Sequence, residues 1–332
     1  MTIKYTNDTG ISLPMAVWLL NDNYDHISDP DYISATSLLK PVQELVLSRR
    51  NRDLDKAIEI SSLLKSQLGS ALHDAIEASW KKPHIIEKAC ALLGIPKEIS
   101  DTIVVNPSDD DIAEIRNAGQ IVTPVYMEQR SHKKIGNYTI GGKYDLILAG
   151  DLHDYKSTGT FTYIKQSNAD KYIQQGSIYR WLNPNKITND ILTINYLFTD
   201  WVAYKINDPG YPQYPAMTQH FQLMSIPETE QFIKNKLALL DKYMEVPDHK
   251  LPQCNDKELW RDPPQYKYFK NPTATRATKN FNEDAEGAYA MMRANGCGEV
   301  KIVPSTAKAC NYCSVQDICH QAKELRKSGE LI

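Results

Sequence analysis

The chain has 332 residues, of which 42% are hydrophobic and 24% charged, with a net charge of −3 and an isoelectric point near 6.3. This composition is typical of a globular protein and excludes extended disorder as well as a strongly basic nucleic-acid binder. Any nucleic-acid site must therefore be a local basic patch. No apolar run approaches the roughly 20 residues of a membrane span. Residues 1–7 lack the apolar core of a signal peptide. We therefore expect a cytoplasmic protein with no membrane partner.

The first part of the chain is predicted to be mainly helical. A Ser/Thr-rich segment at residues 33–39 predicts a helix that Ser34 or Thr36 caps. Residues 53–80 are predicted to form a helix, because apolar side chains recur every four residues between Leu64 and Trp80. A further helix is expected over residues 84–94, where Gly94 and Pro96 follow its end.

The sequence pattern then changes to that of strands. We predict strands at residues 121–128, 138–148 and 152–156, a helix at 170–182, one or two strands within 191–205 and a helix at 226–243. From residue 246 the chain is rich in proline, polar residues and cysteine and is expected to be less regular. This order predicts a mixed α/β domain over residues 1–245 and a cysteine-rich appendage over 246–332.

The predicted hairpin at residues 141–158 carries the residues that suggest chemistry. Asp154 and Lys156 lie two apart and therefore share a strand face. If Ala149-Gly150 forms a two-residue turn, Leu148 pairs with Asp151, and Asp145 then lies opposite Asp154. A three-residue turn would place Asp145 on the other face.

Two carboxylates directly opposite one another destabilise a hairpin unless something compensates. A divalent cation with oxygen ligands would do so, and two carboxylates with a lysine suit metal-dependent phosphodiester hydrolysis. The alternative is a surface hairpin with solvated charges, and the spacing alone does not decide between the two.

Five ordered segments resemble the PD-(D/E)XK nuclease superfamily, in its RecB-like branch of CRISPR-associated and phage exonucleases. They are Ile33-Ser-Ala-Thr-Ser-Leu-Leu39, Gly69-Ser-Ala-Leu-His73, Gly142-Lys-Tyr-Asp145, Asp154-Tyr-Lys156 and Gln175-Gly-Ser-Ile-Tyr179. The resemblance covers about residues 30–205. It implies a restriction-endonuclease-like mixed β-sheet flanked by helices, with a helical N-terminal part and the cysteine-rich appendage.

The resemblance also implies roles for individual residues. Asp145 and Asp154 would hold Mg²⁺ or Mn²⁺, His73 would add a metal ligand, and Lys156 would assist the attacking water. Gln175 and Tyr179 share a helix face and would support these groups. Glu128, in the strand before the hairpin, is a weaker candidate, since an acidic residue lies near this position in some relatives.

Three cysteines, Cys310, Cys313 and Cys319, follow a C-x₂-C-x₅-C pattern. In a reducing compartment this spacing favours metal binding over disulfides, with ordinary reduced thiols as the alternative. The spacing resembles the C-terminal part of the iron–sulfur site in RecB-like exonucleases. Many of those have a further cysteine near the serine-rich motif, where this chain has none.

A closed cysteine site needs a fourth ligand. Cys254 is the first choice because similar phage-type nucleases have a P-x-C…W segment at this point; Cys297 is the second and His320 the third. Four thiolates suit Zn²⁺ or a [4Fe–4S] cluster by count, and the resemblance favours the cluster. Cys90, in a predicted helix, is expected to be buried and structural.

The resemblance thus implies a Mg²⁺- or Mn²⁺-dependent deoxyribonuclease, an exonuclease rather than an endonuclease, in phage or bacterial DNA recombination, repair or processing. Its partner would be DNA, with a helicase or single-strand-binding recombination protein as a further possible partner. If the chain is phage-encoded, it would act in the cytoplasm of the bacterial host. The alternative is a catalytically silent DNA-binding or assembly module on the same fold.

Overall fold

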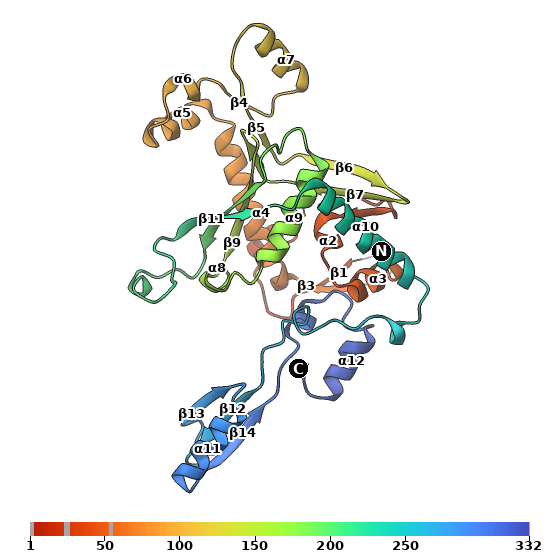
Figure 1. Ribbon diagram of the computed structural model, residues 1–332, viewed down its shortest axis with the longest axis vertical. Helices are drawn as coiled ribbons and strands as arrows, with labels where there is room; N and C mark the ends of the chain where they lie inside the picture. Colours follow the sequence, from red (N-terminus) through yellow and green to blue (C-terminus); the bar gives the residue numbers. More distant parts are fainter. Residues whose placement is uncertain (1–2, 23–26, 53–55, 332) are drawn as a thin grey trace. The chain divides into compact units, whose positions relative to one another are not determined.

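The computed structural model describes residues 3–22, 27–52 and 56–331. The chain divides into two compact units, which are described separately (Figure 1). The first unit comprises residues 1–39 and 54–235, and the second comprises residues 40–53 and 236–332. Among the described residues, no helix has both the length and the apolar character needed to cross a membrane.

The first unit combines helices with most of the strands. Its helices are α1 (Leu13–Leu19), α2 (Ala35–Leu38), α4 (Leu64–Trp80), α5 (Pro83–Leu92), α6 (Lys97–Ser100), α7 (Asp109–Asn117), α8 (Thr160–Lys165) and α9 (Ala169–Leu182). Its strands are β1 (Ile3–Thr6), β2 (Tyr32–Ser34), β3 (Lys56–Glu59), β4 (Ile103–Val105), β5 (Thr123–Met127), β6 (Arg130–Ile135), β7 (Tyr138–Lys143), β8 (Leu146–Leu148), β9 (Asp151–Thr158), β10 (Ile191–Phe198) and β11 (Ala216–Gln222). Two short 3₁₀ helices, η1 (Ile60–Leu63) and η2 (Ala203–Lys205), complete it.

The second unit has its own small sheet. Its elements are α3 (Val42–Arg50), β12 (Gln265–Phe269), β13 (Lys279–Asn282), α11 (Ala285–Asn295), β14 (Glu299–Val303), α12 (His320–Lys327), and the 3₁₀ helices η3 (Asp248–Lys250) and η4 (Lys308–Tyr312). The strands form an antiparallel sheet in the order β13-β12-β14. Helix α10 (Ile226–Tyr243) begins in the first unit and ends in the second.

The core of the first unit is a mixed six-stranded sheet in the order β11-β10-β9-β8-β5-β4. Strands β9 and β10 are parallel, as are β4 and β5, whereas the other neighbours are antiparallel. Helix α9 packs on one face, where Gly176 approaches Leu152 and Leu192. Ile76 and Trp80 of α4 pack against a buried cluster that includes Val125. The predicted mixed α/β fold with helices flanking the sheet is confirmed.

The turn between β8 and β9 has the even length that the site requires. Leu148 pairs with Asp151, so Ala149 and Gly150 form a two-residue turn. Both have positive φ, 51° and 94°, as a type I′ turn demands. Gly150 is needed here because a Cβ would lie 2.2 Å from the hydroxyl oxygen of Thr188. Asp145 therefore lies on the same face of the hairpin as Asp154.

Several predicted elements differ from the observed ones. Helix α4 begins at Leu64 rather than at residue 53, because Lys56–Glu59 pairs with β1 as a strand and a 3₁₀ turn follows; residues 53–55 lie outside the described part of the chain. The strand predicted over 191–205 ends at Phe198. The region after residue 246 is more regular than expected, since it contains β12, β13, β14 and α11.

Candidate metal site and its surroundings

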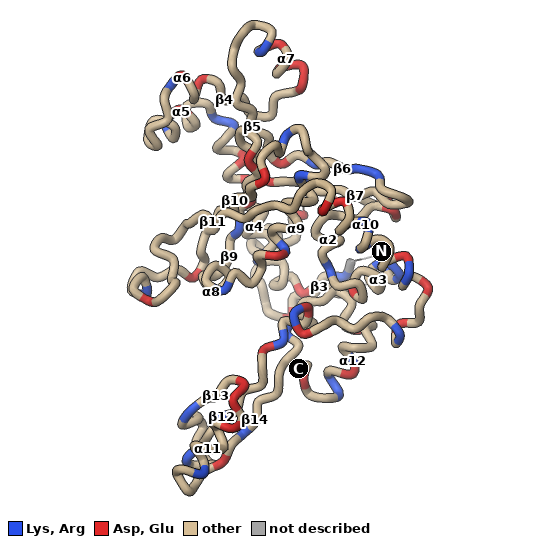
Figure 2. The backbone as a smooth tube through the Cα atoms, viewed as in Figure 1, with Lys and Arg blue, Asp and Glu red and all other residues tan. Residues whose placement is uncertain are grey.

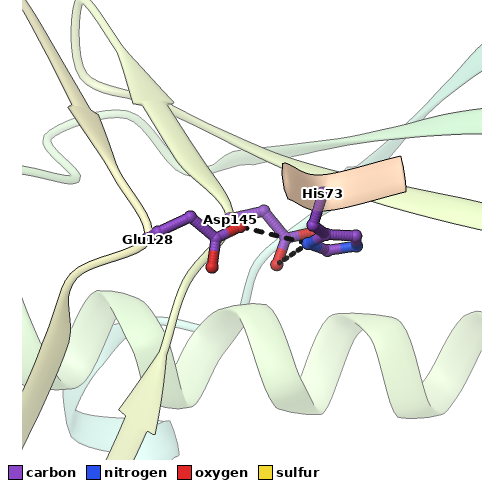
Figure 3. A group of neighbouring side chains, drawn as sticks. All are labelled: His73, Glu128 and Asp145. Carbon is purple, nitrogen blue, oxygen red and sulfur yellow. Dashed lines mark hydrogen bonds and ion pairs between the residues drawn. The ribbon is translucent and has the colours of Figure 1, made fainter. Parts of the chain in front are cut away.

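Three side chains from different elements meet beside the central sheet (Figure 3). His73 projects from α4, Glu128 directly follows β5, and Asp145 lies between β7 and β8. The Nδ1 atom of His73 is 3.1 Å from Glu128 Oε1 and 3.6 Å from Asp145 Oδ1. One potential ligand atom from each residue lies within 4.8 Å of the others. Imidazole and carboxylate donors so close together fit a divalent cation.

The backbone holds Glu128 in an uncommon conformation. Its φ is 51°, in the left-handed region that a glutamate rarely adopts. Its amide donates a hydrogen bond of 3.0 Å to the carbonyl of Asp145, which connects the two ligand positions. Strain of this kind persists where the surrounding structure enforces it, and it is frequent at functional sites.

The surroundings shift the pKa values of all three residues. Burial, together with the nearby Asp154, raises the pKa of Asp145 from 3.8 to about 7. The hydrogen bond that Glu128 accepts from His73 raises the pKa of His73 against the opposing effect of burial. The pKa of Glu128 is lowered: burial opposes its charge, but the contacts with His73 and Lys143 outweigh it. A cation bound between Glu128 and Asp145 would favour the ionised form of Asp145, which burial and Asp154 oppose.

Lys156 is paired with Asp154 beside this cluster. Its Nζ lies 2.5 Å from Asp154 Oδ2, and the side chain of Asp154 is only 8% exposed. Burial opposes the charge of Lys156, but the carboxylates of Asp154 and Asp145 outweigh it and raise the pKa of Lys156. Lys156 is therefore a permanent cation. It can stabilise negative charge or orient a water, but it is not a proton acceptor near neutral pH.

Gln175 and Tyr179 lie one turn apart on α9, as their spacing predicts. Gln175 Nε2 donates a hydrogen bond of 2.7 Å to the hydroxyl of Tyr179. Both residues line a narrow gap together with Asp154. Tyr179 also lines a pocket of about 670 Å³ whose wall includes His73, Glu128 and Asp145. A pocket of this size holds a small group of atoms such as one or two nucleotides.

The structure thus groups the predicted metal residues in a particular way. His73 and Asp145 come together, and Glu128, the weaker candidate, joins them. The carboxylate of Asp154 lies nearby but outside the group of three. Lys143, which sequence reasoning did not single out, binds Glu128 Oε2 at 2.6 Å. Its only sequence signal is its place two residues before Asp145.

Within the second unit, the four predicted cysteines, Cys254, Cys310, Cys313 and Cys319, line one small pocket. Burial raises the pKa of Cys254 to about 12 and that of Cys313 to about 11. Among the described residues, no three cysteine sulfurs all lie within 4.8 Å of one another. Cys297 is exposed and does not line this pocket, and Cys90 is buried, as predicted.

The amide side chain of Gln321 clamps the backbone of Cys254. Its Oε1 accepts a bond of 2.8 Å from the amide of Cys254, and its Nε2 donates one of 2.9 Å to the carbonyl. The Sγ of Cys254 lies 3.6 Å from Oε1 of the buried Gln43. Cys254 is therefore held in place from two sides.

Comparison with solved structures finds distant likenesses. The protein SSO0001 is 14% identical over 70% of this chain and 88% of its own, with a TM-score of 0.40. An alkaline exonuclease from Laribacter hongkongensis is 13% identical over 66% and 93% of the two chains, with a TM-score of 0.33. A phage-related exonuclease from Haemophilus somnus is 16% identical over 40% and 64%, with a TM-score of 0.25. No protein-family model and no curated protein matches the chain.

Proposed function

We propose that the protein is a metal-dependent deoxyribonuclease that hydrolyses phosphodiester bonds from a DNA end. The observation that carries this proposal is the convergence of His73, Glu128 and Asp145 beside the Asp154–Lys156 pair. The three clustered side chains offer cation ligands, and Lys156 adds a fixed positive charge. A cation with room for phosphate, together with that charge, is what phosphodiester hydrolysis requires.

In this proposal each residue has a separate task. His73, Glu128 and Asp145 hold Mg²⁺ or Mn²⁺, with Asp154 as a further carboxylate at the edge of the site. When bound, the cation polarises the phosphate and lowers the pKa of the attacking water. Lys156 stabilises the negative charge that develops on the phosphate. Gln175 and Tyr179 position Asp154, and Tyr179 also forms part of the substrate wall.

The size of the pocket supports cleavage at an end. About 670 Å³ accepts a terminal nucleotide, whereas a continuous duplex would have to lie across its mouth. We propose an exonuclease acting in phage or bacterial DNA recombination or repair, in the bacterial cytoplasm. A helicase or a single-strand-binding protein would supply or hold its substrate. Catalysis would belong to residues 1–245.

The cysteine-lined pocket is proposed to hold a structural [4Fe–4S] cluster within residues 246–332. In a mononuclear zinc site, Zn–S bonds of about 2.3 Å in a tetrahedron place all the sulfurs about 3.8 Å apart. Four thiolates can instead hold a cluster, in which each binds a different iron atom, and the four cysteines that line this pocket offer that number. Zinc remains the alternative, and elemental analysis of the purified protein distinguishes the two.

The test is cleavage of end-labelled linear DNA in the presence of Mg²⁺ or Mn²⁺. We expect Asp154→Ala to abolish cleavage while its circular dichroism spectrum and melting temperature stay close to those of the wild type. Asp151→Ala is the matched control, because this residue lies on the same strand and, among the described residues, its side chain bonds only Asn189. If the wild type does not cut with either cation, the protein is a silent DNA-binding module instead.

A further inference from the structure

The small sheet β2-β7-β6 has two different faces. Strand β7 lies in the middle, parallel to β2 and antiparallel to β6. The inner face contacts α9: Ser131 binds Asn183 at 2.6 Å, and the ammonium of Lys133, which is itself exposed, lies 4.3 Å from the ring centroid of Trp181. Ile140, between these strands, is fully buried. Successive side chains of a strand point to opposite faces, so the residues next to Ser131, Lys133 and Ile140 along each strand must point to the outer face.

The outer face carries a row of basic side chains. Arg130, His132 and Lys134 alternate along β6, and His132 and Lys134 are exposed. Within the described part of the chain, neither His132 nor Lys134 has a side-chain hydrogen bond or ion pair. Figure 2 shows the Lys and Arg positions along β6. At about 3.4 Å per residue, the row from Arg130 to Lys134 spans about 14 Å.

An aromatic ring lies on the same face. A Cβ at Gly141 would be 2.4 Å from Tyr32 Cε2, so the ring rests directly on the backbone of β7. The Tyr32 hydroxyl accepts a hydrogen bond of 3.1 Å from Arg130. Cations that alternate along a strand beside an aromatic ring are the combination found in grooves for single-stranded nucleic acid, where phosphates bind the cations and bases stack.

This face leads to the candidate metal site. Arg130 pairs with Lys143 in the sheet, and Lys143 binds Glu128, one of the three clustered residues. Arg130 and Lys143 also line the pocket next to His73 and Asp145. A strand lying on the outer face would therefore have one end at the candidate metal site.

We propose that the outer face of the β2-β7-β6 sheet binds a single DNA strand and directs its end into the metal site. This rests on the proposed nuclease function. Lys134 and Arg130 contact two phosphates of the strand, His132 lies between them, and Tyr32 stacks on a base. The substrate class is thus single-stranded DNA, and a duplex would have to fray before its end entered.

The test measures binding without cleavage. The full-length protein in EDTA is titrated into a fluorescently labelled oligothymidylate, and anisotropy gives the affinity at several salt concentrations. For single strands, each lost phosphate contact should reduce the slope of log affinity against log salt by about 0.7. We expect this for Lys134→Ala, and about twice this reduction for Lys134→Ala combined with Arg130→Gln.

Lys133→Ala is the matched control, because it removes the same charge from the same strand but from the opposite face, where its ammonium lies over the ring of Trp181. Its slope should equal that of the wild type. Tyr32→Leu should weaken binding about fivefold or more with little change in slope, since stacking releases no counterions. Equal effects of Lys133→Ala and Lys134→Ala would overturn the proposal, as would tighter binding of a blunt duplex of the same length.

The outcomes separate this proposal from the nuclease assignment. If Lys134→Ala binds and cuts like the wild type while Asp154→Ala is inactive, the nuclease assignment holds and the binding face is wrong. If the oligonucleotide binds with the predicted slopes but no cation supports cleavage, the binding face holds and the nuclease assignment is wrong.

Discussion

Replacing Asp145 by Asn should stabilise the metal-free protein while removing a metal ligand. In the folded chain the pKa of Asp145 rises from 3.8 to about 7, chiefly because of burial and then because of Asp154. A raised carboxyl pKa means that the folded state binds the proton more tightly than the unfolded state. This contribution to stability is therefore lost as the pH rises from about 4 through about 7.

The size of the effect follows from the same pKa. At pH 8 the difference between 3.8 and about 7 corresponds to about 4 kcal/mol, which is an upper limit for the gain. Asn can still accept the 2.8 Å hydrogen bond from the amide of Tyr155, so local structure should be retained. The raised pKa of His73 acts in the same direction, because its stabilising charge is also lost as the pH rises.

The assay is urea unfolding in EDTA at pH 8 and pH 5.5. We expect Asp145→Asn to be about 2–4 kcal/mol more stable than the wild type at pH 8, with a smaller difference at pH 5.5. Asp190→Asn, at an exposed position, should change little. Added Mn²⁺ should stabilise the wild type but not Asp145→Asn. Lower stability of Asp145→Asn at pH 8 in EDTA would refute the electrostatic reasoning.

Three further substitutions test the candidate metal site, the neighbouring lysine and the cysteine-lined pocket. Glu128→Gln should weaken Mn²⁺ binding at least about tenfold by calorimetry, because the neutral amide is a poorer ligand; unchanged affinity would remove Glu128 from the metal site. Lys156→Met should lower kcat for DNA cleavage about 10²–10³-fold with little effect on Mn²⁺ affinity, since its cation acts on the developing charge; a rate near that of the wild type would contradict this role. Cys254→Ser should lose bound iron and its visible absorbance and melt at a lower temperature, whereas the exposed Cys297→Ser should keep both; iron retained in Cys254→Ser would exclude Cys254 as a ligand.

Local patterns predicted the parts of the fold whose periodicity is strong. Helix α10 occupies residues 226–243 as expected, since its apolar side chains repeat at helical spacing among lysines. Ser34 caps α2 by accepting a hydrogen bond from the amide of Ser37, which the Ser/Thr-rich segment indicated. In both cases the information lies within a few residues.

The missed elements depend on partners far away in the sequence. Strand β6 has no apolar alternation, because its inner face uses Ser131 and Lys133 to contact α9. Lys56–Glu59 resembles the start of a helix but pairs with β1, about fifty residues earlier. The apolar stripe on α4 predicted a helix, yet Leu64 and Leu68 are exposed, whereas Ile76 and Trp80 near its C-terminal end pack against the core.

In the candidate site, too, some features follow from nearby residues and others from partners far away in the sequence. The face shared by Asp154 and Lys156 follows from the two-residue period of a strand. The place of Glu128 in the metal cluster does not, because it depends on a left-handed φ directly after β5 and on a hydrogen bond to Asp145. No sequence pattern marks that conformation, since most glutamates avoid it.

The two segments on either side of the Ala149-Gly150 turn are subject to a parity rule. Three residues separate Asp145 from the turn and three separate the turn from Asp154, and this equality keeps the two carboxylates on one face. Homologous chains that keep the chemistry should therefore have equal numbers of residues in these two segments, whatever the length of the turn itself. An odd difference between the two numbers would identify a relative in which Asp145 has lost its role or a bulge has restored the phase.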